Sequence, residues 1–323
     1  MDIVFYTHAN AKTGFGHASR AARLAKIISE SAPQIKIGFF GEFDAAAKRV
    51  MSSICTPVFL ENPTARVGVY DRMDDPELPY EWSSSRLETL QKNCESVVFM
   101  ANSSVLPDLP DEITIVGYKL GNEIPDRSKC YWGLDYVPVD LTTEDHLDGH
   151  TQAGYAFVAL GGGRGEAATK TVLKAIDAVE RITQTDILVS PVNQINFAEI
   201  IKSINKPINI LKNIPDVMVP IQRSQVVIAS YGHLGYEAIA MGKPVCIVGQ
   251  KRFQAIYAEE LAKRNLCIAA GIVDDAGYEN VVNSIDHALT RSDELSATAK
   301  SLIDGRGLRR TASVICKTFW ELS

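Results

Sequence analysis

The chain has 323 residues, 46% of them hydrophobic and 22% charged, a length and composition that suggest about two globular domains. These values exclude disordered, collagen-like and coiled-coil proteins. The 33 basic and 39 acidic side chains give a net charge of −6 without a basic block, so nucleic acid is not an expected partner, and no apolar run reaches the roughly 18 residues of a membrane helix.

Apolar runs of strand length alternate with helical periodicity in the first half of the chain. The run Ile3–Tyr6 predicts a strand at the N-terminus, without the basic region and cleavage site of a signal peptide. Apolar residues at helical spacing predict a helix from Ala18 onward. Further strands are predicted at 35–40, 58–60, 96–100 and 113–116, and helices at 43–51 and 83–93. Residues 61–82 contain Pro63, Pro76 and Pro79 and are interpreted as loops.

A second alternating series begins near residue 154. Strands are predicted at 155–160, 186–189, 208–211, 226–229 and 245–248, and helices at 167–182, 217–223, 236–241, 257–264 and 280–290. Mostly apolar strands that alternate with helices indicate parallel sheets covered on both faces. We therefore predict an α/β protein with two doubly wound, Rossmann-like domains, residues 1–150 and 151–305, which face a central cleft.

The loop after the first predicted strand is the first candidate site, because parallel sheets bind ligands at the carboxyl ends of their strands. Gly14 and Gly16 permit a tight turn that leaves backbone amides available to an anion. His17 follows in the first turn of the helix, where an imidazole suits general-base catalysis. Arg20 shares its helix face and is expected to bind a phosphate or to orient an acid.

A nicotinamide-dependent enzyme is an alternative interpretation of the same loop. The dinucleotide fingerprint needs a third glycine where this chain has Ser19. Glu42, after the second predicted strand, is nevertheless an acid that could bind a ribose.

Two further glycine-rich loops lie in the second half of the chain. Gly161, Gly162 and Gly163 end the strand at 155–160 and let a ligand approach the backbone closely. The other loop follows the strand at 226–229 and contributes the expected substrate-binding residues Ser230, Gly232, His233, Leu234, Gly235, Tyr236 and Glu237. The amides of 232–236 are expected to bind a diphosphate, and the Glu237 carboxylate the two hydroxyls of a ribose.

Several segments together resemble a known family. They are Gly14–Arg20 with Leu24 and Ala25 downstream, Leu160–Gly163, Asn213–Met218, Glu237–Pro244 and Gln254–Ala258. This set resembles the UDP-sugar hydrolases of the pseudaminic acid pathway. It is similar, more distantly, to the GT-B glycosyltransferases that add N-acetylglucosamine to lipid I in peptidoglycan synthesis.

The resemblance implies a GT-B-like fold and a UDP-sugar site. It implies that uracil lies near Asn213 and Ile214, the sugar near Gln254, and that His17 activates the group that attacks the anomeric carbon. It also implies that the final segment, 306–323, is a helix that crosses back onto the N-terminal domain. The family's hydroxyl residues before the glutamate are replaced here, and His233 is a candidate cation in their place.

Three functions remain open at this point. Hydrolysis of a UDP-sugar to free sugar and UDP is the first interpretation, because the loop around His17 matches the hydrolases. Transfer of the sugar to an acceptor hydroxyl is the alternative, because residues 67–126 do not match the acidic loop of the hydrolases. A non-catalytic nucleotide-sugar-binding protein is the third.

The remaining sequence features suggest a cytoplasmic protein that needs no cofactor and no metal. The six cysteines are scattered without a Cys-x-x-Cys pair, which favours reduced thiols. Asp74 and Asp75 form an acidic pair, but they lie in a proline-bounded loop rather than at a strand end.

Overall fold

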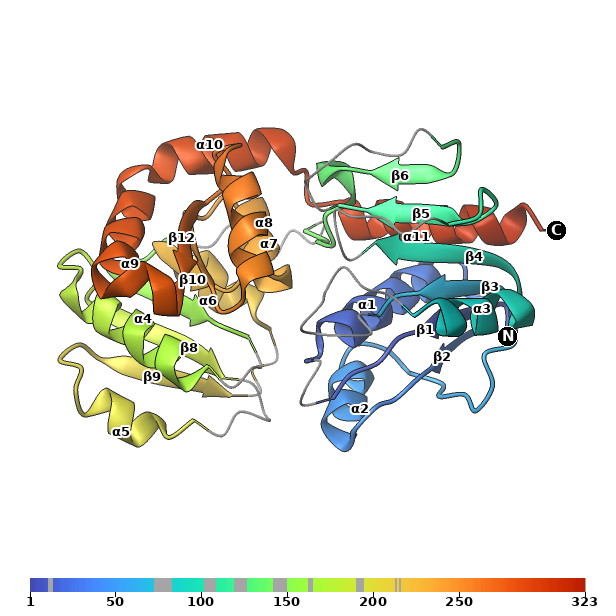
Figure 1. Cartoon of the computed structure of the whole chain (residues 1–323), viewed down its shortest axis with the longest axis horizontal. Helices are drawn as coiled ribbons and strands as arrows, with labels where there is room; N and C mark the ends of the chain where they lie inside the picture. Colours follow the sequence, from blue (N-terminus) through green and yellow to red (C-terminus); the bar gives the residue numbers. More distant parts are fainter. Residues whose placement is uncertain are drawn as a thin grey trace. The chain divides into compact units, whose positions relative to one another are not determined.

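The computed structural model describes residues 1–10, 14–72, 83–101, 109–118, 127–141, 150–161, 165–189, 195–212, 214 and 216–322. The chain forms two compact units, of which unit 1 comprises Met1–Asp140 with Arg306–Ser323 and unit 2 comprises Leu141–Gly305 (Figure 1). Each unit contains a six-stranded sheet whose paired strands are parallel. The predicted α/β class with two Rossmann-like domains is therefore confirmed.

The sheet of unit 1 has the order β2-β1-β3-β4-β5-β6. Its strands are β1 (Ile3–Tyr6), β2 (Ile37–Phe40), β3 (Ala65–Tyr70), β4 (Cys94–Ala101), β5 (Thr114–Gly117) and β6 (Cys130–Trp132). Its helices are α1 (Gly16–Ser31), α2 (Ala45–Ser52), α3 (Ser84–Asn93), the 3-10 turn η1 (Leu134–Tyr136) and α11 (Gly307–Trp320). Residues such as Phe5 and Val69 pack with α1, α2 and α11 on one face, while Tyr6 and Tyr70 pack with α3 on the other.

Four aromatic side chains form a row across the sheet of unit 1. Tyr6 pairs in register with Phe40 on one side and with Tyr70 on the other, and Tyr70 pairs with Phe99. Successive ring centroids lie 5.3, 5.4 and 5.5 Å apart. Such cross-strand aromatic contacts stabilise pairing and register. The row therefore holds the carboxyl ends of β1 and β3 side by side.

The last helix packs against the first unit. Residues of α11 such as Leu308 and Ile315 lie in the same core as α1. At the helix start, a Cβ on Gly307 would lie 1.8 Å from the carbonyl oxygen of Val137. Glycine is thus required there, because the helix begins against the backbone that follows η1.

The sheet of unit 2 has the order β12-β11-β10-β7-β8-β9. Its strands are β7 (Tyr155–Ala159), β8 (Gln184–Val189), β9 (Ile208–Lys212), β10 (Val226–Ala229), β11 (Val245–Gly249) and β12 (Ile268–Ile272). Its helices are α4 (Glu166–Ala178), α5 (Phe197–Ile201), α6 (Met218–Arg223), α7 (His233–Ala240), α8 (Arg252–Ala262), α9 (Val273–Thr290) and α10 (Ser292–Leu302).

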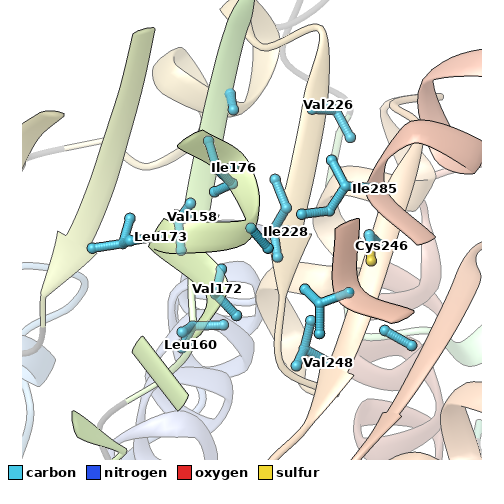
Figure 2. Packing of buried hydrophobic residues seen from close by; sticks show 14 of the residues in the cluster. Val158, Leu160, Val172, Leu173, Ile176, Val226, Ile228, Cys246, Val248 and Ile285 are labelled. Atoms are coloured by element: carbon cyan, nitrogen blue, oxygen red, sulfur yellow. The ribbon is translucent and has the colours of Figure 1, made fainter. Parts of the chain in front are cut away.

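The core of unit 2 fills one face of this sheet. Figure 2 shows Val158, Ile228 and Val248, from three adjacent strands, packed with Ile176 of α4 and Ile285 of α9. Alternate residues of the same strands lie on the opposite face, as the two-residue period of a strand requires. Burial on both faces explains why these strands are nearly continuous apolar runs in the sequence.

Several elements differ from the sequence predictions. The strand predicted at 58–60 is reduced to a single bridge between Phe59 and Phe39, and Val58 is 45% exposed. β3 lies within 61–82, which we interpreted as loops because of the prolines there. β6, β12, α5 and α10 were not predicted, and β12 is mostly small residues that give little apolar signal.

Two other expectations from the sequence concern membrane-spanning helices and the cysteine thiols. Within the described residues, none of the helices combines the length and the apolar character needed to cross a bilayer. All six cysteines are described and all are free thiols. Cys246 is fully buried, and burial raises the pKa of its thiol to about 12.

Candidate active site

The strand order of each sheet reverses at one point, and the candidate residues lie at these two points. The reversal falls between β1 and β3 in unit 1 and between β7 and β10 in unit 2. Loops that leave neighbouring strands at such a point diverge, which makes room for a ligand. Gly14–Arg20 follow β1, whereas Gly161 and 230–237 follow β7 and β10.

In unit 1, three side chains form one buried cluster, the His17–Arg20–Asp71 cluster. Nδ1 of His17 lies 2.9 Å from Oδ1 of Asp71. Nε of Arg20 donates to Oδ2 of Asp71 at 2.8 Å, and Nη2 of Arg20 donates to Oδ1. His17 and Arg20 come from the first turns of α1, whereas Asp71 directly follows β3, and its amide donates to the carbonyl of Tyr6. The side chains of Arg20 and Asp71 are 1% and 0% exposed, and that of His17 is 13% exposed.

The charges of this cluster determine which nitrogen of His17 carries the proton. Burial alone would raise the pKa of Asp71, but the charge of Arg20 and the hydrogen bonds from His17 and Arg20 hold that pKa well below its usual range. Conversely, Asp71 outweighs burial and keeps the pKa of Arg20 above its usual value. An ionised Asp71 can only accept hydrogen bonds, so Nδ1 of His17 must donate. When the imidazole is neutral, its proton therefore lies on Nδ1 and its lone pair on Nε2, as a general base requires.

Tyr118 and His8 complete the surroundings of the cluster. Nη1 of Arg20 donates to the Tyr118 hydroxyl at 3.4 Å, and the guanidinium lies 5.9 Å from the centre of the Tyr118 ring. The His8 ring, which follows β1 and is 2% exposed, lies 6.1 Å from the His17 ring. Tyr118, which follows β5, thus contacts Arg20, and His8 lies beside His17 within the connection from β1 to α1.

The glycines before His17 have different roles. Gly14 has φ +75°, a left-handed conformation that favours glycine, and its amide donates to the carbonyl of Asn10 at 2.9 Å. Gly16 is the first residue of α1 and is exposed. Within the described residues, no heavy atom lies within 4 Å of the Cβ position at Gly14. The turn therefore leaves room at the amino end of α1.

In unit 2, the exposed start of α7 is the second candidate region. Gly232 is the N-cap of α7 without a side-chain cap, and no heavy atom of the described part of the chain lies within 4 Å of its Cβ position. Gly232, His233 and Leu234 are half-exposed, whereas Gly235 onward is buried. The first-turn amides of a helix carry a partial positive charge and favour anions. This is the arrangement expected for a diphosphate site.

Polar side chains join the carboxyl ends of three strands in unit 2. The Ser230 hydroxyl donates to the carbonyl of Leu160 at 3.0 Å, which connects the end of β10 to the end of β7. Nε2 of Gln250, after β11, donates to Ser230 Oγ at 2.8 Å and also to the Leu160 carbonyl. The hydroxyl proton of Ser230, a predicted substrate contact, is thus engaged within the protein. Gln250 was not singled out from the sequence.

Two other predicted residues of this loop are buried. The Tyr236 hydroxyl lies 2.8 Å from the Tyr231 hydroxyl, and Tyr236 is 1% exposed. Glu237 is also 1% exposed. Burying an ionised carboxylate costs free energy unless hydrogen bonds or an opposite charge compensate it. Glu237 is therefore a candidate for a polar ligand contact.

The remaining predicted residues lie around the same sheet or outside the described residues. Oε1 of Gln254 accepts from the amides of Gln250 and Lys251 at 2.8 and 3.2 Å, so this side chain caps α8. Ile214 is half-buried after β9, and Gly161 has φ +80° with open space at its Cβ position. Gly162, Gly163 and Asn213 lie outside the described residues, as does the pair Asp74–Asp75.

Asp71 is the member of the His17–Arg20–Asp71 cluster that the sequence reasoning missed. Its signal was the run Arg66-Val67-Gly68-Val69-Tyr70, in which a short apolar strand is followed by an acid. An acid after a buried strand lies at the edge where parallel sheets bind ligands. The prolines at 63 and 76 obscured that pattern.

Comparisons with known proteins give the fold. Neither protein-family models nor curated protein sequences match this chain. Among solved structures, MurG of Acinetobacter baumannii has a TM-score of 0.64 at 12% identity, over 98% of this chain and 100% of that one. Spinosyn rhamnosyltransferase SpnG complexed with thymidine diphosphate has a TM-score of 0.60 at 12% identity, over 97% and 100%. A UDP-N-acetylglucosamine 2-epimerase has a TM-score of 0.55 at 11% identity, over 100% and 97%. The chain therefore has a GT-B-like fold with two Rossmann-like domains.

Proposed function

We propose that this chain is a nucleotide-sugar-utilising enzyme that transfers a sugar from a UDP-sugar to an acceptor hydroxyl. The observation that carries the proposal is the 2.9 Å contact between His17 and the ionised Asp71, which leaves Nε2 of His17 as the proton acceptor. A neutral, oriented imidazole at a ligand-binding edge is the usual device for activating a hydroxyl nucleophile.

The chemistry divides between the two units. The acceptor hydroxyl attacks the anomeric carbon, its proton passes to Nε2 of His17, and the bond from that carbon to the diphosphate oxygen breaks. The departing UDP takes the bonding electrons as negative charge. Amides at the start of α7, from Gly232 onward, are assigned to that charge, because fixed dipoles stabilise it without reorganisation. Glu237 is assigned to the ribose.

Arg20 has an indirect role in this scheme. The positive charge of Arg20 stabilises the ionised form of Asp71. The Asp71 carboxylate can then accept a hydrogen bond from His17 and keep the proton of His17 on Nδ1. Because Arg20 offsets the negative charge of Asp71, the main effect of Asp71 on His17 is to orient the imidazole ring. Arg20 and Asp71 are therefore positioning residues, whereas His17 is the catalytic one.

The fold comparisons support transfer over hydrolysis. MurG and SpnG share the fold along almost the whole chain, and SpnG is named a rhamnosyltransferase. Hydrolysis is the second candidate, and the match of Gly14–Arg20 to the hydrolase pattern favours it. In that reaction water replaces the acceptor hydroxyl and gives up its proton to the same imidazole.

A substrate panel tests the proposal. The protein is incubated with a set of UDP- and dTDP-sugars, alone and with a cell extract as the source of acceptors, and free nucleotide and sugar products are measured. Transfer predicts nucleotide release that depends on the extract, whereas hydrolysis predicts equal release without it. Release that does not depend on His17, or no release and no altered sugar with any member of the panel, would contradict both.

A further inference from the structure

A separate pocket of about 430 Å³ lies in unit 1 between β6, η1 and α11. Four cations and two tyrosines account for most of its lining: Arg306, Arg309, Arg310, Lys317, Tyr131 and Tyr136. None of these residues belongs to the His17–Arg20–Asp71 cluster or to the α7 loop. Its volume lies within the range of small-molecule sites.

Among the described residues that line this pocket there is no carboxylate, although the chain as a whole is acidic with a net charge of −6. Arg306, Arg310 and Lys317 follow one another at intervals of four and seven along α11, so they share one face of the helix. Ser313 lies between them on that face and is small enough to leave space. The positive charge is thus concentrated on a concave surface.

The start of α11 violates the usual distribution of charge along a helix. Its N-cap is Arg306 without a side-chain cap, Arg309 and Arg310 follow in the first turn, and that turn has no acidic residue. The amino end of a helix is itself partially positive, and like charges four positions apart repel each other. Asp140 offsets part of this charge through its ion pair with Arg309, and a bound anion would offset more of it.

Hydrogen bonds fix the cationic side chains of this pocket. Nε of Arg309 donates to Asp140 at 2.9 Å, and Nη1 of Arg310 donates to the carbonyl of Asp135 at 3.1 Å. Nζ of Lys317 donates to the Tyr131 hydroxyl at 3.4 Å and lies 3.7 Å from Oε1 of Glu321, with which it forms an ion pair. These bonds keep the cations at the pocket. The side chains of Arg309 and Lys317 are still 47% and 63% exposed, so a ligand can reach them.

We propose that this pocket is a second ligand site that binds a phosphate or diphosphate group. Guanidinium groups match the oxygen geometry of phosphate with paired N–H donors, and the helix start adds favourable dipoles. Tyr131 and Tyr136, whose rings meet edge-to-face at 6.0 Å, form an aromatic wall for whatever carries the phosphate. The same chemistry is offered by a soluble phosphorylated metabolite and by an anionic lipid headgroup.

The test compares three forms of the full chain in calorimetric titrations with inorganic pyrophosphate. They are the wild type, the pocket variant Arg306→Gln/Arg310→Gln, and the control variant Arg49→Gln/Arg264→Gln. The control removes the same charge at exposed positions outside the pocket. We expect at least tenfold weaker binding by the pocket variant and less than twofold change in the control. None of the substitutions lies in α7, so any binding of pyrophosphate at the start of α7 contributes equally to the titrations of all three proteins.

Sedimentation with vesicles identifies the source of the phosphate. Phosphatidylcholine vesicles with and without phosphatidic acid are mixed with the same three proteins. Binding to phosphatidic acid vesicles that the pocket variant alone loses indicates a lipid headgroup, whereas pyrophosphate binding without vesicle binding indicates a soluble ligand. Equal binding by the pocket and control variants in both assays, or no binding by the wild type in either, would overturn the proposal.

A thermal measurement separates ligand binding from a structural role of the arginines. In the absence of pyrophosphate, the melting temperature of the pocket variant reports the structural role of the two arginines, including the bond from Arg310 to the carbonyl of Asp135. Pyrophosphate should raise the melting temperature of the wild type and the control more than that of the pocket variant. A pocket variant that melts lower yet keeps the full pyrophosphate effect contradicts the proposal.

Discussion

Nδ1 of His17 lies 2.9 Å from Oδ1 of Asp71, although 54 positions separate the two residues in the sequence. The contact exists because β1 and β3 are neighbours in the sheet, so the loops that follow them begin at the same edge. Arg20 binds the second oxygen of Asp71 from the same helix as His17. The strand order thus assembles an oriented imidazole from two distant segments.

Replacing the acid of this cluster should affect both stability and turnover. Asp71→Asn keeps the side-chain shape but leaves the buried Arg20 without its counter-charge, which is expected to cost about 3–5 kcal/mol of unfolding free energy. The amide can also donate to Nδ1 of His17 and so favour the wrong tautomer, which should lower turnover by roughly 100-fold or more. Urea denaturation and nucleotide release measure the two effects. Asp286→Asn, at a half-exposed position of α9, is the control and should change neither. Unchanged unfolding free energy in Asp71→Asn contradicts the assignment.

The same carboxylate predicts how stability depends on pH. The pKa of Asp71 is held below its usual range in the folded state, so its ionised form stabilises the fold. That stabilisation is complete above the unfolded pKa of about 3.9 and is lost as the pH falls from there toward the folded pKa. We expect the unfolding free energy of the wild type to fall more steeply below about pH 4 than that of Asp71→Asn. Parallel curves for the two proteins in denaturant titrations would count against an ionised Asp71.

Gly232→Ala tests the diphosphate site with little structural disturbance. Gly232 has an extended φ of 168°, which any residue can adopt, and none of the residues that the structure describes has a heavy atom within 4 Å of its Cβ position. The fold therefore gives no reason for glycine, and the melting temperature should be unchanged. A methyl group over the first-turn amides of α7 should nevertheless weaken UDP binding by about tenfold, which corresponds to about 1.4 kcal/mol. Undiminished UDP affinity in calorimetry would show that the start of α7 does not contact the nucleotide.

Glu237→Gln tests the ribose assignment. Gln preserves the shape of this buried side chain but removes its charge, so charged hydrogen bonds to ribose hydroxyls are weakened. We expect a loss of about 1–3 kcal/mol in UDP binding, and a smaller loss for 2′-deoxy-UDP, which lacks one of the hydroxyls. The control is Glu279→Gln at an exposed position of α9. An equal loss for both ligands would mean that Glu237 acts on the fold of α7 rather than on the ribose.

The fold class was predictable because burial on both faces leaves an unambiguous record in the sequence. Runs such as Val226–Ala229 and Tyr155–Ala159 are apolar throughout and are followed within three residues by a glycine. β3 was missed because Gly68 and the flanking prolines mimic a loop, and 58–60 was predicted as a strand because exposed apolar residues resemble buried ones. Pairing in the sheet, which decides both cases, is not a local property.

The parts of the candidate site that depend on particular residue types after a strand were predictable from the sequence. Glycines and a histidine after an apolar run indicated the loop of Gly14–Arg20 and the start of α7. The partner of His17 was not predictable, because it depends on β3 lying beside β1. Likewise, Ser230 and Gln254 form hydrogen bonds within the protein, with the Leu160 carbonyl and with the start of α8, which their positions in the sequence do not reveal.

The most direct test of the central claim is the turnover of His17→Ala with a nucleotide sugar that the wild type consumes. Nucleotide release is measured at saturating substrate, and UDP binding is measured in parallel by calorimetry. Removal of the general base predicts release at least 100-fold slower, with UDP affinity within about twofold of the wild type. His287→Ala, at an exposed position of α9, should match the wild type in both measurements. Wild-type turnover in His17→Ala would contradict the account.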